Sequence, residues 1–141
     1  MLSPVIPELA ALVRQSPGSL SLAQGMVGWD PPETVPRAVA EALAAGGPEL
    51  HRYGALQGDS PLLEAVSTKL LSQNGLDLDG AAVLVTAGSN MAFSAVVQVI
   101  AEGSPAGPSE VILPLPYYFN HVMAVQLAGA VPVLVEGGAI P

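Results

Sequence analysis

The C-terminal half of the sequence alternates short apolar runs with segments of helical spacing, and this alternation constrains the fold most strongly. The runs lie at 82–86, 110–114 and 131–135, and the helical segments at about 89–101 and 119–128. This order favours a parallel sheet with right-handed crossovers. Because the runs are continuous rather than alternating, helices should cover both faces of the sheet. We expect an α/β fold with three layers, αβα, and a mainly parallel sheet, in which Pro132 begins a strand or stays unpaired.

Helical spacing also marks three segments that precede these runs. The segment 3–15 opens with Ser3 and Pro4, residues that suit an N-cap and a first helical turn. The segments 36–45 and 60–74 carry apolar residues at every fourth position, and a glycine follows each of them. We expect a helix in each of the three segments.

Charge and composition narrow the classes of partner and site. Twelve acidic residues against four basic ones give a net charge of −8, so a basic face for nucleic acid is not expected. There is no cysteine, and His51 and His121 are too few for a metal cluster. No apolar run approaches the roughly 20 residues of a membrane span, and Arg14 interrupts the first apolar segment. We expect a cytoplasmic protein that binds no metal, nucleic acid or membrane.

Two turns combine residue types that suit ligand binding, and each follows an apolar run. Ala87-Gly88-Ser89-Asn90 leads into a helix, whose unpaired N–H groups and dipole favour a phosphate. Pro116-Tyr117-Tyr118-Phe119-Asn120-His121 places an aromatic cluster next to an amide and an imidazole. Ligands of such sheets bind beyond the carboxyl ends of the strands, so the two turns together suit a phosphorylated planar ring. Taken singly, each pattern is also typical of helix capping and core packing.

Further motifs between Leu20 and Val135 place these two turns in a longer ordered series. The series comprises Leu22-Ala23-Gln24-Gly25, Val35-Pro36-Arg37-Ala38-Val39, Tyr53 with Gly58, Val85-Thr86-Ala87-Gly88-Ser89-Asn90-Met91-Ala92, Pro116-Tyr117-Tyr118-Phe119-Asn120-His121 and Ala128-Gly129-Ala130. In order and spacing it resembles the fold type I pyridoxal-phosphate-dependent aminotransferases, the class I/II family similar to aspartate aminotransferase. The resemblance implies an N-terminal arm and small-domain segment in 1–48, and the beginning of the cofactor-binding large domain in 49–141.

The resemblance also implies roles for particular residues. The cofactor, pyridoxal 5'-phosphate, would be bound by Ala87, Gly88, Ser89, Tyr118, Tyr53 and His121, and the substrate by Gly25. The first three would hold the phosphate, Tyr118 would stack on the pyridine ring, and His121 would support the aspartate that pairs with the ring nitrogen. Tyr53 would reach the phosphate in the neighbouring subunit of a homodimer, and Gly25 would lie near the substrate carboxylate.

The implied activity moves an amino group between an amino acid and a 2-oxo acid. The sequence departs from the family pattern at Leu62-Leu63, in the long loop 103–109, and at Leu113-Pro114-Leu115, where an acidic residue is common. The more serious departure is that no residue of this sequence matches the family's Schiff-base lysine. The single lysine of the chain, Lys69, lies in a predicted helix away from the two turns. We expect an N-terminal fragment that does not transaminate unaided, and we assign no catalytic residue.

Two alternatives stay open. A β-lyase or related fold type I enzyme would use the same phosphate and ring sites, and released thiol or ammonia would identify it. A non-catalytic α/β ligand-binding module would instead unfold cooperatively as an isolated chain. A transcriptional regulator with a similar domain would need a basic DNA-binding segment, which these residues do not contain.

Overall fold

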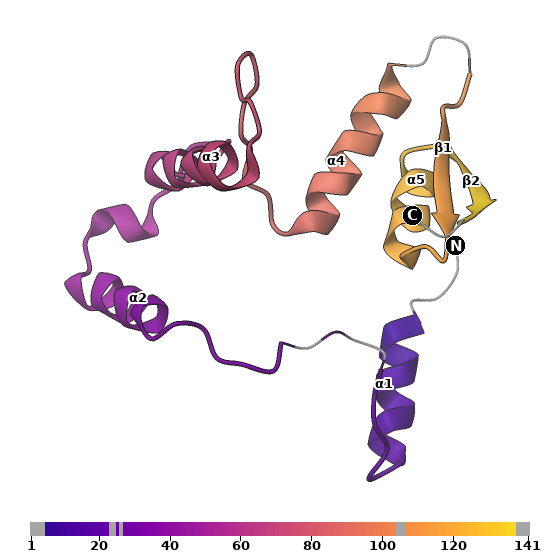
Figure 1. The fold of residues 1–141 in the computed structure, drawn as a ribbon, viewed down its shortest axis with the longest axis horizontal. Coiled ribbons are helices and arrows are strands. Elements are labelled where there is room, and N and C mark those ends of the chain that lie inside the picture. The colour runs from indigo at the N-terminus through magenta and orange to yellow at the C-terminus, as the bar shows by residue number, and fades with distance from the viewer. Residues whose placement is uncertain (1–4, 23–24, 26, 104–106, 138–141) are drawn as a thin grey trace. The chain divides into compact units, whose positions relative to one another are not determined.

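The computed structural model describes residues 5–22, 25, 27–103 and 107–137, which form two units that divide between Leu56 and Gln57 (Figure 1). The first unit is helical, and the second contains both helix and sheet. The domain boundary expected after residue 48 concerns the complete fold of the family, and it stays a prediction.

The first unit consists of two helices and a short 3-10 turn. These are α1 (Val5–Gln15), α2 (Thr34–Ala45) and η1 (Pro48–His51). Both helices were predicted, although residues 3 and 4 of the expected first helix lie outside the described residues. The helix α2 starts two residues earlier than expected, because Pro36 falls in its first turn, where a missing N–H breaks no helical hydrogen bond. No residue of α1 or α2 is buried.

The second unit opens with α3 (Ser60–Asn74), as predicted. Proline stands at the start of this helix, and Gly75 ends it in the left-handed conformation with φ 65° and ψ 24°. The N–H of Leu76 then donates to the carbonyl of Leu70 at 3.1 Å, which satisfies one of the last helical carbonyls.

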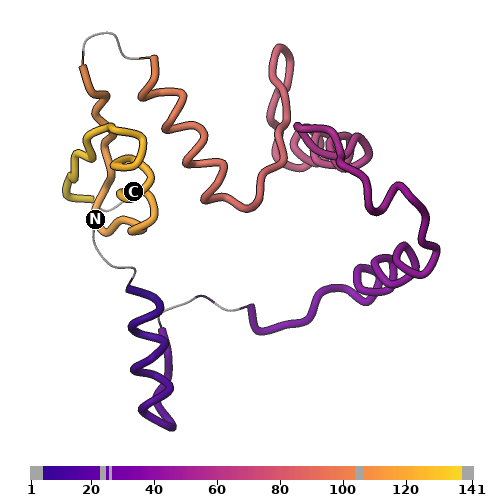
Figure 2. Tube along the Cα trace, turned by 180° about the vertical axis from the view of Figure 1, so that it is seen from behind, coloured from indigo at the N-terminus to yellow at the C-terminus, as the bar shows by residue number. Residues whose placement is uncertain are grey.

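The remaining elements are α4 (Ser89–Glu102), β1 (Glu110–Leu115), α5 (Phe119–Leu127) and β2 (Val131–Glu136). The two strands pair in parallel, and the Cα of Val111 lies opposite that of Pro132. Pro132 is thus the second residue of its strand, close to the start that was predicted. Helix α5 contacts both strands and α4 contacts α5, an arrangement that the chain trace in Figure 2 also shows.

A small hydrophobic core holds these four elements together. Its buried members are Val97 of α4, Leu113 of β1, Val125 of α5 and Ala130 before β2. Val125 is fully buried and Val97 is 2% exposed. Burial of an aliphatic side chain contributes about 1.5–3 kcal/mol, so these contacts fix α4 and α5 against each other.

One predicted element is wrong. The apolar run 82–86 is not a strand, so the sheet of the described residues has two strands instead of the three expected. A strand needs a neighbour for its N–H and C=O groups, and for this run the N–H of Val85 donates at 2.8 Å to the carbonyl of Gln57, which belongs to a loop. The expected αβα layering is therefore present only in part. Among the described helices, none has the length and apolar character of a membrane-spanning segment.

Candidate functional site

The first part of the site is the turn before α4, residues 86–91, which we call the α4 turn. The N–H of Gly88 donates to the carbonyl of Thr86 at 2.8 Å, and the Thr86 hydroxyl donates back to the carbonyl of Gly88 at 2.9 Å. Gly88 has φ 83° and ψ 169°, a conformation that only glycine adopts readily. The paired hydrogen bonds and this glycine together set how the chain enters α4.

The α4 turn presents hydrogen-bond donors that have no partner among the described residues. The backbone N–H groups of Ser89, Asn90 and Met91 lie in the first helical turn, and neither they nor the Ser89 hydroxyl has a hydrogen bond in the described chain. A Cβ placed on Gly88 would meet no atom within 4 Å, so the space beside the turn is open. Unpaired amides, a hydroxyl and the helix dipole form a donor set that suits a phosphate.

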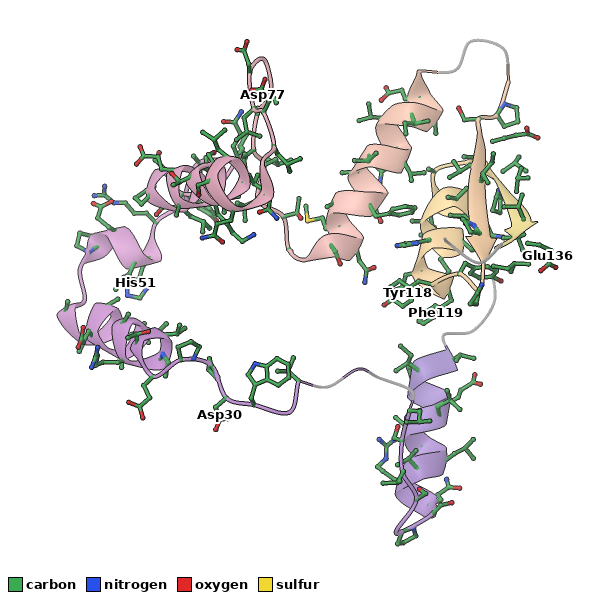
Figure 3. The ribbon with its side chains drawn as sticks, viewed as in Figure 1. Asp30, His51, Asp77, Tyr118, Phe119 and Glu136 are labelled. Atoms are coloured by element: carbon green, nitrogen blue, oxygen red, sulfur yellow. The ribbon has the colours of Figure 1, made fainter. Side chains whose placement is uncertain are left out.

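The second part of the site is the aromatic loop, residues 116–121, which joins β1 to α5. Tyr118 is 43% exposed, and Phe119 and His121 meet its ring edge-on at centroid distances of 5.1 and 5.4 Å. The Asn120 side-chain amide donates to the Tyr118 hydroxyl at 2.8 Å. Figure 3 shows Tyr118 and Phe119 together at the start of α5. The tyrosine ring is therefore oriented by its neighbours and still accessible for stacking.

A ring stack connects the two parts. The side chain of Phe93, on α4, lies parallel to the imidazole of His121, with 4.1 Å between centroids and 22° between planes. Phe93 also packs against the buried core cluster. The helix that begins at the α4 turn is thus held directly to a residue that contacts Tyr118.

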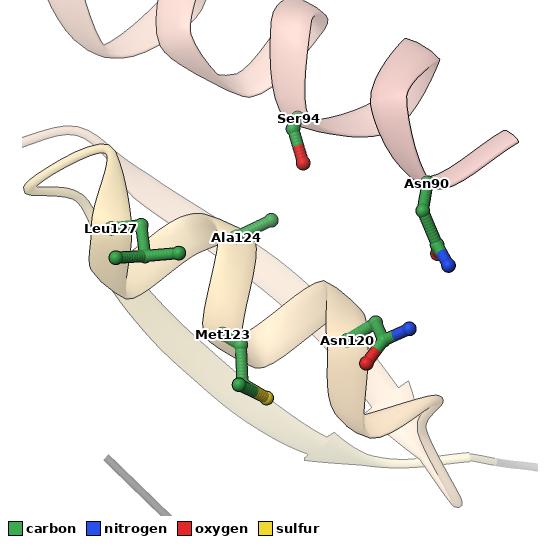
Figure 4. A pocket seen from close by; sticks show the side chains of 6 residues that line it. All are labelled: Asn90, Ser94, Asn120, Met123, Ala124 and Leu127. Carbon is green, nitrogen blue, oxygen red and sulfur yellow. The ribbon is translucent and has the colours of Figure 1, made fainter. Parts of the chain in front are cut away.

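A shallow cavity of about 190 Å³ also lies between the beginning of α4 and the length of α5. It is lined by Asn90, Ser94, Asn120, Met123, Ala124 and Leu127, and Figure 4 shows the two asparagines at the same end of it. Asn90 and Asn120 are each the second residue of their helix. The structure therefore brings the α4 turn and the aromatic loop, which are about 30 residues apart in the sequence, to one side of the unit.

Of the other residues named in the sequence analysis, Ala87 lies in the α4 turn, whereas Gly25, Tyr53 and Lys69 lie elsewhere in the chain. Gly25 and Tyr53 belong to the first unit, where Tyr53 is fully exposed and a Cβ on Gly25 would meet nothing within 4 Å. Their contacts with a ligand stay predictions. Lys69 lies on α3, where its ammonium donates to the Asn74 side-chain oxygen at 2.8 Å. Ala87 lies between the paired Thr86 and Gly88 of the α4 turn.

Sequence reasoning gave no role to Thr86, Phe93 or Asn120, although the structure places all three in the site. Phe93 follows Ser89 by four residues, so helical spacing puts both on one face of α4. This spacing was the available signal, but it could not identify the ring on which Phe93 stacks. Asn120 lay in the predicted aromatic cluster, and its hydrogen bond to Tyr118 depends on how the loop folds.

Comparison with known proteins shows the same family in sequence and in structure. The family model of class I and II aminotransferases matches residues 19–137. An aromatic aminotransferase of Arabidopsis thaliana is 36% identical over 135 residues, which cover 96% of this chain and 32% of that protein. A solved Pyrococcus protein superposes with a TM-score of 0.80 at 30% identity and covers 97% of this chain and 34% of its own.

The structure of N-succinyldiaminopimelate aminotransferase from Mycobacterium tuberculosis superposes with a TM-score of 0.78 at 32% identity, over 95% of this chain and 33% of that one. The chain therefore spans about a third of the length of the relatives that it matches, and it corresponds to an N-terminal portion of them.

Proposed function

The chain belongs to the family of class I and II aminotransferases, and we propose that it forms the cofactor-binding beginning of an enzyme that moves an amino group from an amino acid to a 2-oxo acid. The observation that carries this proposal is the pairing of a helix start rich in unpaired donors with a half-exposed tyrosine ring. Pyridoxal 5'-phosphate, the cofactor of the family, offers a phosphate to the first and a planar ring to the second.

In this proposal each half of the site holds one part of the cofactor. Ser89 and the amides that follow it bind the phosphate, while Ala87 and Gly88 shape the turn. Tyr118 stacks on the pyridine ring. His121, held between Phe93 and Tyr118, keeps the group that pairs with the ring nitrogen in place. When bound, the cofactor supplies the electron sink that amino-group transfer needs, and the chain supplies binding and orientation.

Residues of the first unit complete the proposed site in a homodimer. Tyr53, fully exposed here, would reach the phosphate bound by the neighbouring subunit, and Gly25 would approach the substrate carboxylate. Exposure of a tyrosine ring suits a residue that binds across an interface. The small-molecule partners in this proposal are an amino acid and a 2-oxo acid.

We further propose that the 141 residues bind the cofactor without catalysing transamination unaided. The family's chemistry needs an activated lysine beside the cofactor. The one lysine of the sequence, Lys69, is on α3, and its ammonium is hydrogen-bonded to Asn74 of the same helix. The binding function and the catalytic function can therefore be tested separately.

Calorimetric titration of the 141-residue chain tests the binding function. Pyridoxal phosphate should bind more tightly than inorganic phosphate or pyridoxal, because it alone uses both the α4 turn and Tyr118. Equal affinity for pyridoxal and pyridoxal phosphate would contradict the phosphate site.

Turnover by the protein expressed from its native gene tests the reaction. Aspartate and aromatic amino acids, each with 2-oxoglutarate, should yield the corresponding 2-oxo acid and glutamate in equal amounts. Release of ammonia or a thiol in place of glutamate would instead identify a lyase.

A further inference from the structure

We propose that Phe93 is a positioning residue that sets the relation between the α4 turn and the Tyr118 ring, and so makes the site selective for ligands that carry both a phosphate and an aromatic ring. The inference rests on the proposed function, but it concerns a residue to which neither the sequence motifs nor the family resemblance assigned a role.

Three aromatic rings connect α4 to the aromatic loop. The rings of Phe93 and His121 are stacked at 4.1 Å, and His121 in turn meets the ring of Tyr118 edge-on at 5.4 Å. The three rings thus form a continuous series from α4 to the ring proposed to stack on the cofactor. Stacked and edge-to-face aromatic pairs are favourable beyond the area that they bury, so each contact restrains the next ring.

Phe93 is itself held in place. It packs against the core cluster that contains Val97 and Val125, the most buried residues of α4 and α5. It also lies one helical turn after Ser89, the first residue of α4. Because Phe93 is fixed relative to the α4 turn and stacks on His121, it restrains where the His121 ring lies relative to that turn.

The other restraints on Tyr118 come from its own loop and from α5. Asn120 donates to its hydroxyl, and Phe119 meets its edge. Both residues move together with Tyr118 if the loop shifts relative to α4. Within the described part of the chain, the aromatic contact that ties this loop to α4 is the stack of Phe93 on His121.

This arrangement predicts different effects on different ligands. Inorganic phosphate uses the α4 turn alone, so its affinity should not depend on where Tyr118 stands. Pyridoxal phosphate has a fixed span between its phosphate and its ring, so its affinity should fall when the relation between the two parts loosens.

The experiment measures binding to the 141-residue chain by calorimetry for Phe93→Leu, Phe93→Tyr and the parent sequence. Phe93→Leu should lower the affinity for pyridoxal phosphate about two- to tenfold and leave the affinity for inorganic phosphate unchanged. Phe93→Tyr keeps the ring and should restore parent affinity. Val99→Ala, at a position of the same helix that is 70% exposed, is the matched control and should change neither ligand.

A double-mutant cycle shows whether Phe93 acts through His121. In a His121→Ala background, Phe93→Leu should have no further effect on pyridoxal phosphate binding. An independent structural readout is the NMR spectrum of the chain without ligand. The ring protons of His121 should be shifted upfield by the Phe93 ring current in the parent and in Phe93→Tyr, and this shift should vanish in Phe93→Leu.

Two results would overturn the inference while leaving the proposed function intact. One is an equal fall in the affinities for pyridoxal phosphate and inorganic phosphate in Phe93→Leu, which would indicate general damage to α4. The other is a Phe93→Leu variant that binds pyridoxal phosphate as tightly as the parent, although its spectrum shows that the upfield shift of the His121 ring protons has been lost. If the parent chain itself fails to prefer pyridoxal phosphate over inorganic phosphate, the proposed function fails first, and the inference fails with it.

Discussion

The α4 turn and the aromatic loop face one candidate ligand site but are built from different parts of the chain. The α4 turn offers mainly backbone: three N–H groups that are unpaired within the described chain, and whose direction depends on the conformation of Gly88 and the two hydrogen bonds between Gly88 and Thr86. The aromatic loop offers side chains: Tyr118, braced by Phe119, His121 and the Asn120 amide.

This difference predicts which changes each half tolerates. A backbone site depends on dihedral angles, so substitutions matter there when they alter the path of the chain. A side-chain site depends on the identity of the ring and of the groups that orient it. Variants of the α4 turn should therefore affect every ligand with a phosphate, whereas variants of the loop should affect only ligands with a ring.

Gly88→Val should have the largest effect. The conformation at Gly88 costs a residue with a side chain about 1–3 kcal/mol, so the turn should relax and its amides should lose their common direction. We expect the affinities for pyridoxal phosphate and inorganic phosphate to fall together, by roughly 10- to 100-fold in calorimetry. A loss of affinity for pyridoxal phosphate alone, with unchanged affinity for inorganic phosphate, would show that the α4 turn does not act through the phosphate.

Gly80→Val is the matched control for backbone strain. Gly80 also has a positive φ, 70°, with no atom within 4 Å of a built Cβ, but it lies outside the α4 turn. This variant should lower the thermal unfolding midpoint and leave both affinities unchanged.

Tyr118→Ala should have the next largest effect, and on one ligand only. Removing the ring removes the stacking surface, so pyridoxal phosphate should bind about tenfold more weakly while inorganic phosphate is unaffected. Titration with both ligands checks this, and Tyr118→Phe should retain most of the affinity. Unchanged affinity in Tyr118→Ala would mean that the ring is not part of the site.

Thr86→Val should lower the affinity for both ligands about two- to fivefold. The change removes the hydrogen bond from the Thr86 hydroxyl to the Gly88 carbonyl, with a net contribution of about 1 kcal/mol, while the shape of the side chain stays nearly constant. Thr86→Ser keeps the hydroxyl and should bind like the parent. The same calorimetric series measures both variants, and a Ser variant as weak as Val would show that the hydrogen bond of the hydroxyl does not by itself account for the parent affinity.

Asn120→Leu should have the smallest effect. The Asn120 amide donates to the Tyr118 hydroxyl at an exposed position, so loss of this hydrogen bond should lower the affinity for pyridoxal phosphate by at most about twofold. Tyr118→Phe removes the same bond from the other side, and the double variant should be no weaker than either single one in titration. Additive losses would show that Asn120 contacts the ligand directly.

The helices of the second unit illustrate what a single sequence can reveal. The start of α3 at Ser60-Pro61 and its end at Gly75 follow from local rules, because a proline suits the first turn and a glycine suits the left-handed end. The residues of the two turns were also found locally, since Gly88 and Tyr118 stand out within their own segments. The roles proposed for them came from the order of motifs along the chain.

The run 82–86 shows where local rules stop. Its residues favour a strand, but strand formation depends on a neighbouring strand, and the described chain places none beside it. The stack of Phe93 on His121 was hidden for a related reason. Two residues 28 positions apart meet there only because Val97 and Val125 are buried together.

The sequence by itself thus determined where the α-helices lie, the donor-rich turn, the aromatic loop and the family resemblance, because each depends on residues that are near one another or in a recognisable order. Only the tertiary structure decided that run 82–86 is not a strand, that α4 packs on α5, and that Phe93 joins the two halves of the site. These features depend on contacts between distant segments, and such contacts follow from which side chains are buried together.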